Sequence, residues 1–294
     1  MGSDSDWDYP LTEEEIEAID AAFSAADAAL QPMNKRHVPN CTNVPGSSHS
    51  PPKTRRRLPE SLFSISHCST KRSYRTRNTT YRSPFQDVRF GGCIVYSRTT
   101  EEVERAADEL LNFVEAKTKK EGLCILGLDI EWRPTFRRGV APGKAAVMQI
   151  CGDNNRCHVL HIIHSGIPKN LQCLLEDPSS MKVGVCIAND AAKVLQDHNV
   201  SINSLGELSD LANQKLGGDL KKWSLSTLTE MIICKQLPKP NKIRLGNWEV
   251  EVLSKEQLNY AATDAYVSWY LYQALRSLPD PTVDTKNVES GSGT

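Results

Sequence analysis

The stretch from residue 125 to residue 132 reads Ile-Leu-Gly-Leu-Asp-Ile-Glu-Trp, an apolar run that carries two acidic residues, Asp129 and Glu131. Its pattern is typical of a buried β-strand, in which alternate residues point to the same face. Both carboxylates would therefore project together beside an apolar sheet, which is costly unless a cation neutralises them. Because carboxylates and water are the ligands that Mg²⁺ prefers, the stretch predicts one part of a metal-dependent active site.

The chain has 294 residues and a formal net charge of −1, and its charges are unevenly distributed. Residues 4–27 are acidic and contain no Lys or Arg, whereas residues 35–89 are strongly basic. We interpret the acidic block as a partner-facing or solvated segment. The basic block is typical of a contact with nucleic acid or with an import receptor.

Cysteine content and hydropathy indicate the compartment. The nine cysteines form no CxxC pair, so neither a zinc cluster nor a disulfide framework is predicted, as expected in a reducing environment. The N-terminus has no basic, apolar signal region, and no apolar run approaches the roughly 20 residues that cross a bilayer. We therefore expect a soluble intracellular protein without a membrane contact.

We predict a largely disordered N-terminal extension over residues 1–85, because its composition cannot bury enough apolar surface to offset the entropy of ordering. Within it, residues 12–30 have the spacing of a short amphipathic helix that would fold against a protein partner or not at all. The basic segment 53–57 resembles a nuclear-import signal, which predicts localisation in the nucleus.

A folded domain is predicted over residues 90–278, followed by a polar tail over 279–294. Strands come first and helices are interleaved later, which favours an α/β fold with a mixed β-sheet flanked by helices. Strands are predicted at 93–96, 125–132, 145–151, 157–163 and 182–187, and helices at 100–114, 171–175, 190–198, 205–215, 224–234 and 254–275.

The last predicted helix contains Tyr260 and Asp264, which are four residues apart and therefore share one face. Ser254 and Gln257 have the spacing of a capping box that would fix its start. A tyrosine hydroxyl beside a metal-binding carboxylate can orient an attacking water molecule. The alternative is that Tyr260 packs in the core and Asp264 is a surface charge.

Asp190 stands where a predicted strand gives way to a helix. A helix start favours a carboxylate for reasons of its dipole alone. Ligand sites of open α/β sheets also lie at the ends of strands, so we predict that Asp190 joins the site. It is preferred over four competing acidic residues, which are Asp153, Asp197, Asp210 and Asp219.

Three groups of residues along the chain resemble, in the same order, the three exonuclease motifs of the DEDD superfamily. They are Asp129 with Glu131, then Asp190, then Tyr260 with Asp264. The resemblance is to its tyrosine-containing branch, because the histidine-containing branch has His where this chain has Asn259. Residues 222–225, 243–248 and 260–266 are similar to the Werner syndrome exonuclease domain, and the likeness covers about residues 90–278. It implies a ribonuclease H-like fold and a stand-alone exonuclease of the type that plants carry.

The resemblance further implies that Asp129, Glu131, Asp190 and Asp264 hold two Mg²⁺ or Mn²⁺ ions, with Tyr260 helping to activate the water. The expected reaction removes nucleotides from the 3′ ends of DNA, with recessed 3′ ends of duplexes as the expected substrate. Such an enzyme would act in DNA repair, recombination or the maintenance of replication.

Nucleic-acid contacts are predicted from a basic cluster that is interleaved with tryptophans. For Trp223 and Trp248 the alternative is packing in the core, and three histidines (158, 161 and 164) are expected to be structural or exposed. Trp132, next to Glu131, would stack on the terminal nucleotide. The cluster comprises Lys221, Lys222, Lys235, Lys239, Lys242 and Arg244, with Trp223 and Trp248.

Two alternatives stay open. One is an RNA-trimming enzyme similar to ribonuclease D, although only a short tail follows residue 278 here. The other is a catalytically inactive nucleic-acid-binding protein, which the complete set of carboxylates disfavours. The sequence does not choose between DNA and RNA, and it specifies neither the preferred end structure nor the oligomeric state.

Overall fold

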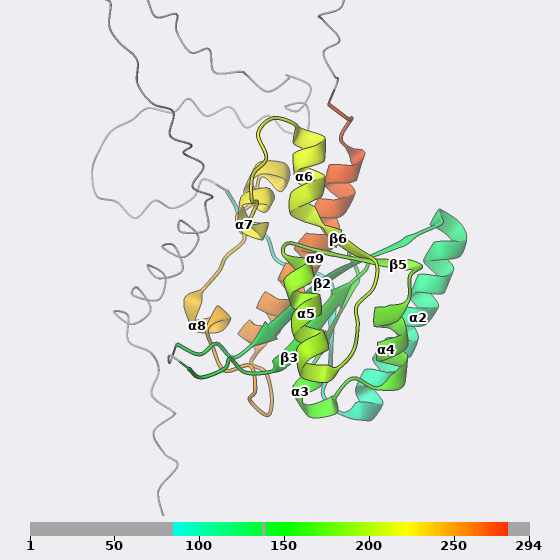
Figure 1. Cartoon of the computed structure of the whole chain (residues 1–294), viewed down its shortest axis with the longest axis vertical. Helices are drawn as coiled ribbons and strands as arrows, with labels where there is room; N and C mark the ends of the chain where they lie inside the picture. Colours follow the sequence, from blue (N-terminus) through cyan, green and yellow to red (C-terminus); the bar gives the residue numbers. More distant parts are fainter. Residues whose placement is uncertain (1–84, 137–138, 282–294) are drawn as a thin grey trace, which may run out of the picture. The chain divides into compact units, whose positions relative to one another are not determined.

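The computed structural model describes residues 85–136 and 139–281 (Figure 1). The predicted helix at 12–30 and the basic segment 53–57 lie outside the described residues. The same holds for nearly all of the extension 1–85 and for the tail beyond residue 281.

A six-stranded sheet forms the centre of the described domain, with the strand order β1-β4-β3-β2-β5-β6. β3 is antiparallel to both of its neighbours, and the other three pairings are parallel. The predicted mixed sheet is thus confirmed. Its strands are β1 (Cys93–Ser97), β2 (Cys124–Trp132), β3 (Ala145–Cys151), β4 (Arg156–Leu160), β5 (Ser180–Gly184) and β6 (Leu205–Glu207).

Helices cover both faces of this sheet (Figure 1). On one face α2, α4 and α5 share a core with Leu126, Leu128 and Ile130 of β2. On the other face α6, α7 and α9 pack over Ile125 of the same strand. The helices are α2 (Thr100–Glu121), α3 (Ile162–Ser165), α4 (Lys169–Glu176), α5 (Ile187–His198), α6 (Leu208–Leu216), α7 (Leu225–Leu228), the π-helix η2 (Thr229–Ile233), α8 (Asn241–Arg244) and α9 (Lys255–Ser277).

The two longest helices begin at capping boxes that the sequence shows. Thr99 caps α2 with Glu102 as its reciprocal partner, and Ser254 caps α9 with Gln257. Each box satisfies two backbone donors that would otherwise have no partner at a helix start. None of the helices in the described ranges is both long and apolar enough to span a membrane.

Several predicted boundaries were wrong, because sheet pairing overrides local pattern. The strand predicted at 157–163 stops at Leu160, and the chain turns into α3 after the His161 amide donates to the Ser97 carbonyl over 2.8 Å. The helix predicted at 205–215 starts with three residues that pair with β5 as β6. The segment 224–234 is divided into α7 and η2, and α8 was not predicted.

Gly127 brings α9 directly against β2. A Cβ atom at this position would overlap the backbone oxygen of Ala265 and lie 2.6 Å from the backbone nitrogen of Trp269. Glycine inside a strand often marks such a close approach of another backbone. This contact places the middle of α9, and therefore Asp264, beside the carboxyl end of β2.

Candidate active site

Asp129 and Glu131 project from β2 on the face that α9 covers, because they alternate with Leu128 and Ile130 of the opposite core. The pairing of β2 with β5 ends at Gly127. Both carboxylates therefore lie beyond the last paired residue of β5, at the carboxyl ends of two parallel strands. This is where open α/β sheets place their ligand sites.

The middle of α9 adds the third carboxylate. Asp129, Glu131 and Asp264 each offer an oxygen atom, and these atoms lie within 4.8 Å of one another. Asp264 is 5% exposed, so the alternative that it is a surface charge is wrong. Its Oδ1 atom has no hydrogen-bond partner in the described part of the chain, although buried oxygen atoms nearly always have one.

Asp190 lies in the first turn of α5 and is 9% exposed, but it is outside the group of three. Its charge nevertheless contributes to raising the pKa values of Asp129 and Glu131. Two of the four competing carboxylates have other partners: Asp153 accepts from the amides of Asn155 and Arg156, and Asp197 pairs with Lys193 at 2.7 Å.

Glu207 fixes the start of the helix that carries Asp190. Cys186, at the N-cap of α5, adopts a left-handed conformation and forms no side-chain cap. Glu207 of β6 instead accepts from the Ile187 amide at 3.2 Å and, through its other oxygen, from the Ser209 amide at 3.1 Å. It thereby caps both α5 and α6. Sequence reasoning missed Glu207, whose relevant signal is only an acidic residue just before a helix.

The pKa values of all four carboxyl groups of the site are raised, in each case chiefly by burial. Burial raises the pKa values of Asp129 and Glu131 well above their usual range, and the neighbouring carboxylates add to this effect. Burial, followed by the charge of Glu207, raises the pKa of Asp190 to about 7. Burial also raises the pKa of Asp264 to about 6. The site therefore holds protons near neutral pH unless a cation compensates the charge.

The opposing positive charge comes from Lys239, which lowers the pKa values of Asp129, Glu131 and Asp264. Lys239 is exposed and stands between Pro238 and Pro240, in the segment that joins η2 to α8. Proline restricts the backbone on both sides of it. The sequence placed Lys239 in the basic cluster but gave no reason to single it out.

Tyr260 lies one turn before Asp264 on α9. Its hydroxyl lowers the pKa of Asp264, against the larger effect of burial, which raises it. Burial, together with the charges of Asp264, Glu131 and Asp129, raises the pKa of Tyr260 far above its usual value. Tyr260 is therefore a protonated hydrogen-bond donor at neutral pH, and its phenolate form is disfavoured.

These residues fit a divalent cation that prefers oxygen ligands. The donor set consists of carboxylates alone, and it includes the buried Asp264 Oδ1 without a partner. Gln149 of β3 is paired with Asp129 across the sheet, is fully buried, and has neither amide atom hydrogen-bonded to a described residue. Sequence reasoning missed Gln149 because it lies in an apolar strand.

The predicted nucleic-acid contacts are spread over several elements. Lys222, Lys235 and Lys242 are exposed, and Arg244 donates to the Asn241 side chain over 3.1 Å.

Both predicted tryptophan contacts have packing partners. Trp223 is partly buried, and its indole donates to Asn213 over 2.9 Å. Trp132 packs with the core under α5, where the Lys193 ammonium lies 5.2 Å from its ring centre. It is therefore on the face opposite to Asp129. Contacts of these residues with nucleic acid stay predictions.

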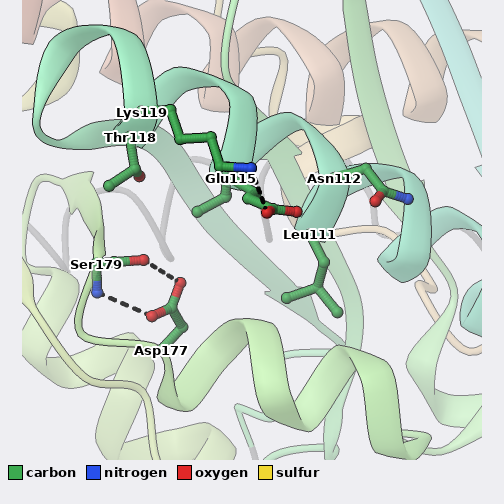
Figure 2. A pocket seen from close by; sticks show the side chains of 8 residues that line it. Leu111, Asn112, Glu115, Thr118, Lys119, Asp177 and Ser179 are labelled. Carbon is green, nitrogen blue, oxygen red and sulfur yellow. Dashed lines mark hydrogen bonds and ion pairs between the residues drawn. The ribbon is translucent and has the colours of Figure 1, made fainter.

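A pocket of about 380 Å³ lies elsewhere, between α2 and the turn before β5 (Figure 2). Cys124, the first residue of β2, pairs with Ser180, so this pocket is at the end of β2 opposite to the carboxylates. Its residues are Leu111, Asn112, Val114, Glu115, Thr118, Lys119, Asp177 and Ser179. No group of possible metal ligands was found there among the described residues.

Residues 95–279 match the model of a known family, described as 3′-5′ exonuclease. This chain belongs to the 3′-5′ exonuclease family. A 3′-5′ exonuclease of Arabidopsis thaliana is 48% identical to it, over 95% of this chain and 98% of the relative. The bifunctional 3′-5′ exonuclease/ATP-dependent helicase WRN of Mus musculus is 33% identical, over 76% of this chain but 16% of that protein. The expected class of enzyme, a phosphodiester hydrolase, is thereby confirmed.

Solved structures agree with this assignment at the level of the fold. The match to Escherichia coli RNase D has a TM-score of 0.50 at 18% identity and covers 62% of this chain and 44% of that one. The catalytic core of RRP6 from Trypanosoma brucei gives 0.51 at 19% identity, over 67% and 49% of the two chains. The chain spans about half the length of these structures. The predicted ribonuclease H-like fold is confirmed.

Proposed function

We propose that this exonuclease is a divalent-cation-dependent enzyme that removes nucleotides from the 3′ ends of DNA. The observation that carries the proposal is the group of three carboxylate oxygens within 4.8 Å of one another, at the carboxyl end of β2. Asp190 at the start of α5 and Tyr260 on α9 complete the set of residues that the sequence singled out.

Asp129, Glu131 and Asp264 would hold the cation, and Asp190 would complete a second set of ligands. Two Mg²⁺ or Mn²⁺ ions, when bound, supply the neutralising charge and polarise the phosphate that is cleaved. Four carboxylates approximately balance the charge of two divalent ions. This balance removes the electrostatic cost of ionising Asp129 and Glu131, which their raised pKa values reflect.

Two other side chains of the site act on the substrate. The protonated Tyr260 hydroxyl would orient the attacking water by a hydrogen bond, a positioning role. Lys239 would contact the phosphate that is cleaved, because its charge already acts on the carboxylates that would hold the cation. Preorganised positive charge of this kind stabilises the charge that develops in the transition state.

DNA is the proposed substrate because the chain is 33% identical in sequence to the WRN exonuclease/helicase, whereas its likeness to RNase D, at 18% identity, is one of fold alone. The exposed Lys222, Lys235 and Lys242 would contact backbone phosphates without regard to base sequence. A recessed 3′ end of a duplex is the proposed form of the substrate. RNA trimming is the alternative outcome of the test.

We also propose a role in DNA repair, recombination or replication maintenance in the nucleus. The basic segment 53–57 supports the location, and the acidic segment 12–30 supports binding of a protein partner. Nuclear localisation of a fluorescent fusion, and its loss when residues 55–57 are replaced by alanine, would test the first part.

The proposed reaction is tested with 5′-labelled DNA duplexes that carry recessed, blunt or overhanging 3′ ends, beside single-stranded DNA and RNA. With Mg²⁺ or Mn²⁺ we expect a ladder of products that shorten by one nucleotide, most rapidly from the recessed end. EDTA is expected to abolish it. Faster digestion of single-stranded RNA would overturn the DNA assignment, and full activity in EDTA would overturn the dependence on metal.

A further inference from the structure

The loop that joins α8 to α9, residues 245–254, is held by side chains from a distant part of the sequence. Arg98, which follows β1, donates to the Glu251 carbonyl oxygen over 2.9 Å. His164 of α3 donates through Nε2 to the Val250 carbonyl oxygen, also over 2.9 Å. The position of this loop, and of the helix start after it, therefore depends on β1 and α3.

His161 makes the innermost contact with this loop. It is fully buried, and its Nε2 lies 3.0 Å from the carbonyl oxygen of Trp248. Because a carbonyl oxygen only accepts, Nε2 carries the proton, and Nδ1 accepts from the Tyr96 hydroxyl at 2.7 Å. The Tyr96 oxygen in turn accepts from the Leu253 amide over 3.3 Å. Two residues thus fix both ends of the loop segment 248–253.

Trp248 connects this network to the active site. Its side chain is fully buried, and its indole donates to the Arg244 carbonyl oxygen over 3.3 Å. Its ring lies 6.2 Å from the ring of Tyr260, centre to centre, at 45°. A continuous series of contacts thus leads from Tyr96 of β1 through His161 and Trp248 to Tyr260.

We propose that His161, held by Tyr96, is a positioning residue that fixes Trp248 as the surface against which the Tyr260 ring is placed beside Asp264. The inference rests on the proposed function, because it assigns the effect of His161 to the hydrolytic role of Tyr260. Burial lowers the pKa of His161 to about 4, so its hydrogen-bond pattern is the same throughout the neutral range.

The test is a double-mutant cycle on DNA hydrolysis with His161→Phe and Tyr260→Phe. Phenylalanine keeps a ring at position 161 and removes both nitrogen atoms. We expect His161→Phe to lower kcat about tenfold in the otherwise unchanged protein, with unchanged KM for DNA and unchanged Mn²⁺ affinity. In the Tyr260→Phe background the same change is expected to lower kcat less than about twofold, because no hydroxyl is left to position.

Tyr96→Phe is the second variant, because it removes one hydroxyl and spares the buried imidazole. It is expected to lower kcat by a smaller factor that also disappears in the Tyr260→Phe background. Arg98→Ala is the matched control, because it releases Glu251 of the same loop and removes no ring contact with His161, and we expect kcat to be unchanged.

An equal loss of kcat in both backgrounds would overturn the positioning role, as would an Arg98→Ala variant that behaves like His161→Phe. A Tyr260→Phe variant as active as the parent protein would overturn it too. Failure of the proposed function is a separate result: the parent protein itself would then show no cation-dependent hydrolysis of DNA.

Discussion

The central strand β2 has charged groups near both of its ends, and the two ends differ in how those charges are balanced. At its first residues, the fully buried Lys182 of β5 donates to the Asp177 carbonyl oxygen over 2.9 Å. Asp177 accepts from the Ser179 hydroxyl at 2.6 Å, and Glu115 pairs with Lys119 at 2.6 Å (Figure 2). The charges at this end have partners within the chain.

At the other end of β2, Asp129, Glu131 and Asp264 lie together, and Lys239 supplies the opposing charge. The pocket of about 380 Å³ is at the balanced end, whereas the chemistry that we propose belongs to the unbalanced end. The comparison teaches that clustered carboxylates without an ion pair among the described residues mark the proposed active site of this fold better than cavity volume does.

The largest effect is expected from neutralising one carboxylate at the reactive end. Asp129→Asn is expected to lower kcat at least about a thousandfold, which corresponds to about 4 kcal/mol of transition-state stabilisation. Glu115→Gln, at the balanced end, is the matched control and is expected to leave kcat unchanged. Digestion of a labelled duplex with Mg²⁺ measures kcat for both variants. Comparable losses of kcat in the two variants would contradict the proposed difference between the two ends of β2.

The next largest effect is expected from a change in the packing of α9 on β2. Gly127→Ala is expected to lower the free energy of unfolding by about 1–3 kcal/mol and kcat by about a hundredfold, because the new Cβ overlaps the backbone of α9 and displaces Asp264. Gly91→Ala is the control, since a Cβ there has no atom within 4 Å. Chemical denaturation and kinetics together check this, and a fully active Gly127→Ala protein would contradict the role of the contact.

Lys239 is expected to act on the reaction itself, and Lys242 only on binding. Lys239→Ala should lower kcat about tenfold, because its charge acts on the carboxylates of the site. Lys242→Ala should instead raise KM and weaken its dependence on salt, as loss of one phosphate contact does. Steady-state kinetics at several salt concentrations separate the two effects. If both variants changed only KM, and by the same factor, Lys239 would have no role in the chemical step.

The smallest effect concerns stability in the absence of metal. In the folded protein the pKa of Asp190 is about 7 and that of Asp264 about 6, both above the ordinary value of 3.8. The folded state therefore binds protons more tightly than the unfolded one, and this contribution to stability is lost as pH rises from about 4 to about 7.

Divalent cations are expected to restore the stability that is lost as pH rises. At a concentration about 100 times the Kd measured at pH 8, Mn²⁺ should add about 2.7 kcal/mol to the free energy of unfolding at that pH, and the same concentration should add less at pH 5, where protons compete for the carboxylates. Thermal melts with Mn²⁺ and with EDTA measure the difference. An equal shift of Tm at both pH values would show that the carboxylates are not the binding groups.

Local rules were enough to predict the parts of the site that depend on residues close together in the sequence. Alternation along β2 placed Asp129 and Glu131 on one face, and helical spacing placed Tyr260 with Asp264. The Ser254 capping box located the start of α9 correctly. These predictions succeeded because each depends on residues fewer than five positions apart.

The groups that complete the site are placed by long-range contacts, which local patterns do not contain. Glu207 reaches α5 because β6 pairs with β5, with Gly184 opposite Glu207. The segment of Lys239 is anchored by Gln236, whose backbone exchanges hydrogen bonds with Gln86 and Val88, about 150 residues earlier in the sequence. His161 was expected to be merely structural or exposed, and its contacts with Tyr96 and Trp248 could not be inferred from spacing.

The central claim is that the carboxylates at the reactive end of β2, and no groups at the other end, bind the divalent cation. Calorimetric titration with Mn²⁺ at pH 7.5 of the parent protein, Asp264→Asn and Glu115→Gln tests it most directly. The account predicts equal affinity for the parent protein and Glu115→Gln, and binding at least about tenfold weaker in Asp264→Asn. Equal Mn²⁺ affinity in all three proteins would contradict it.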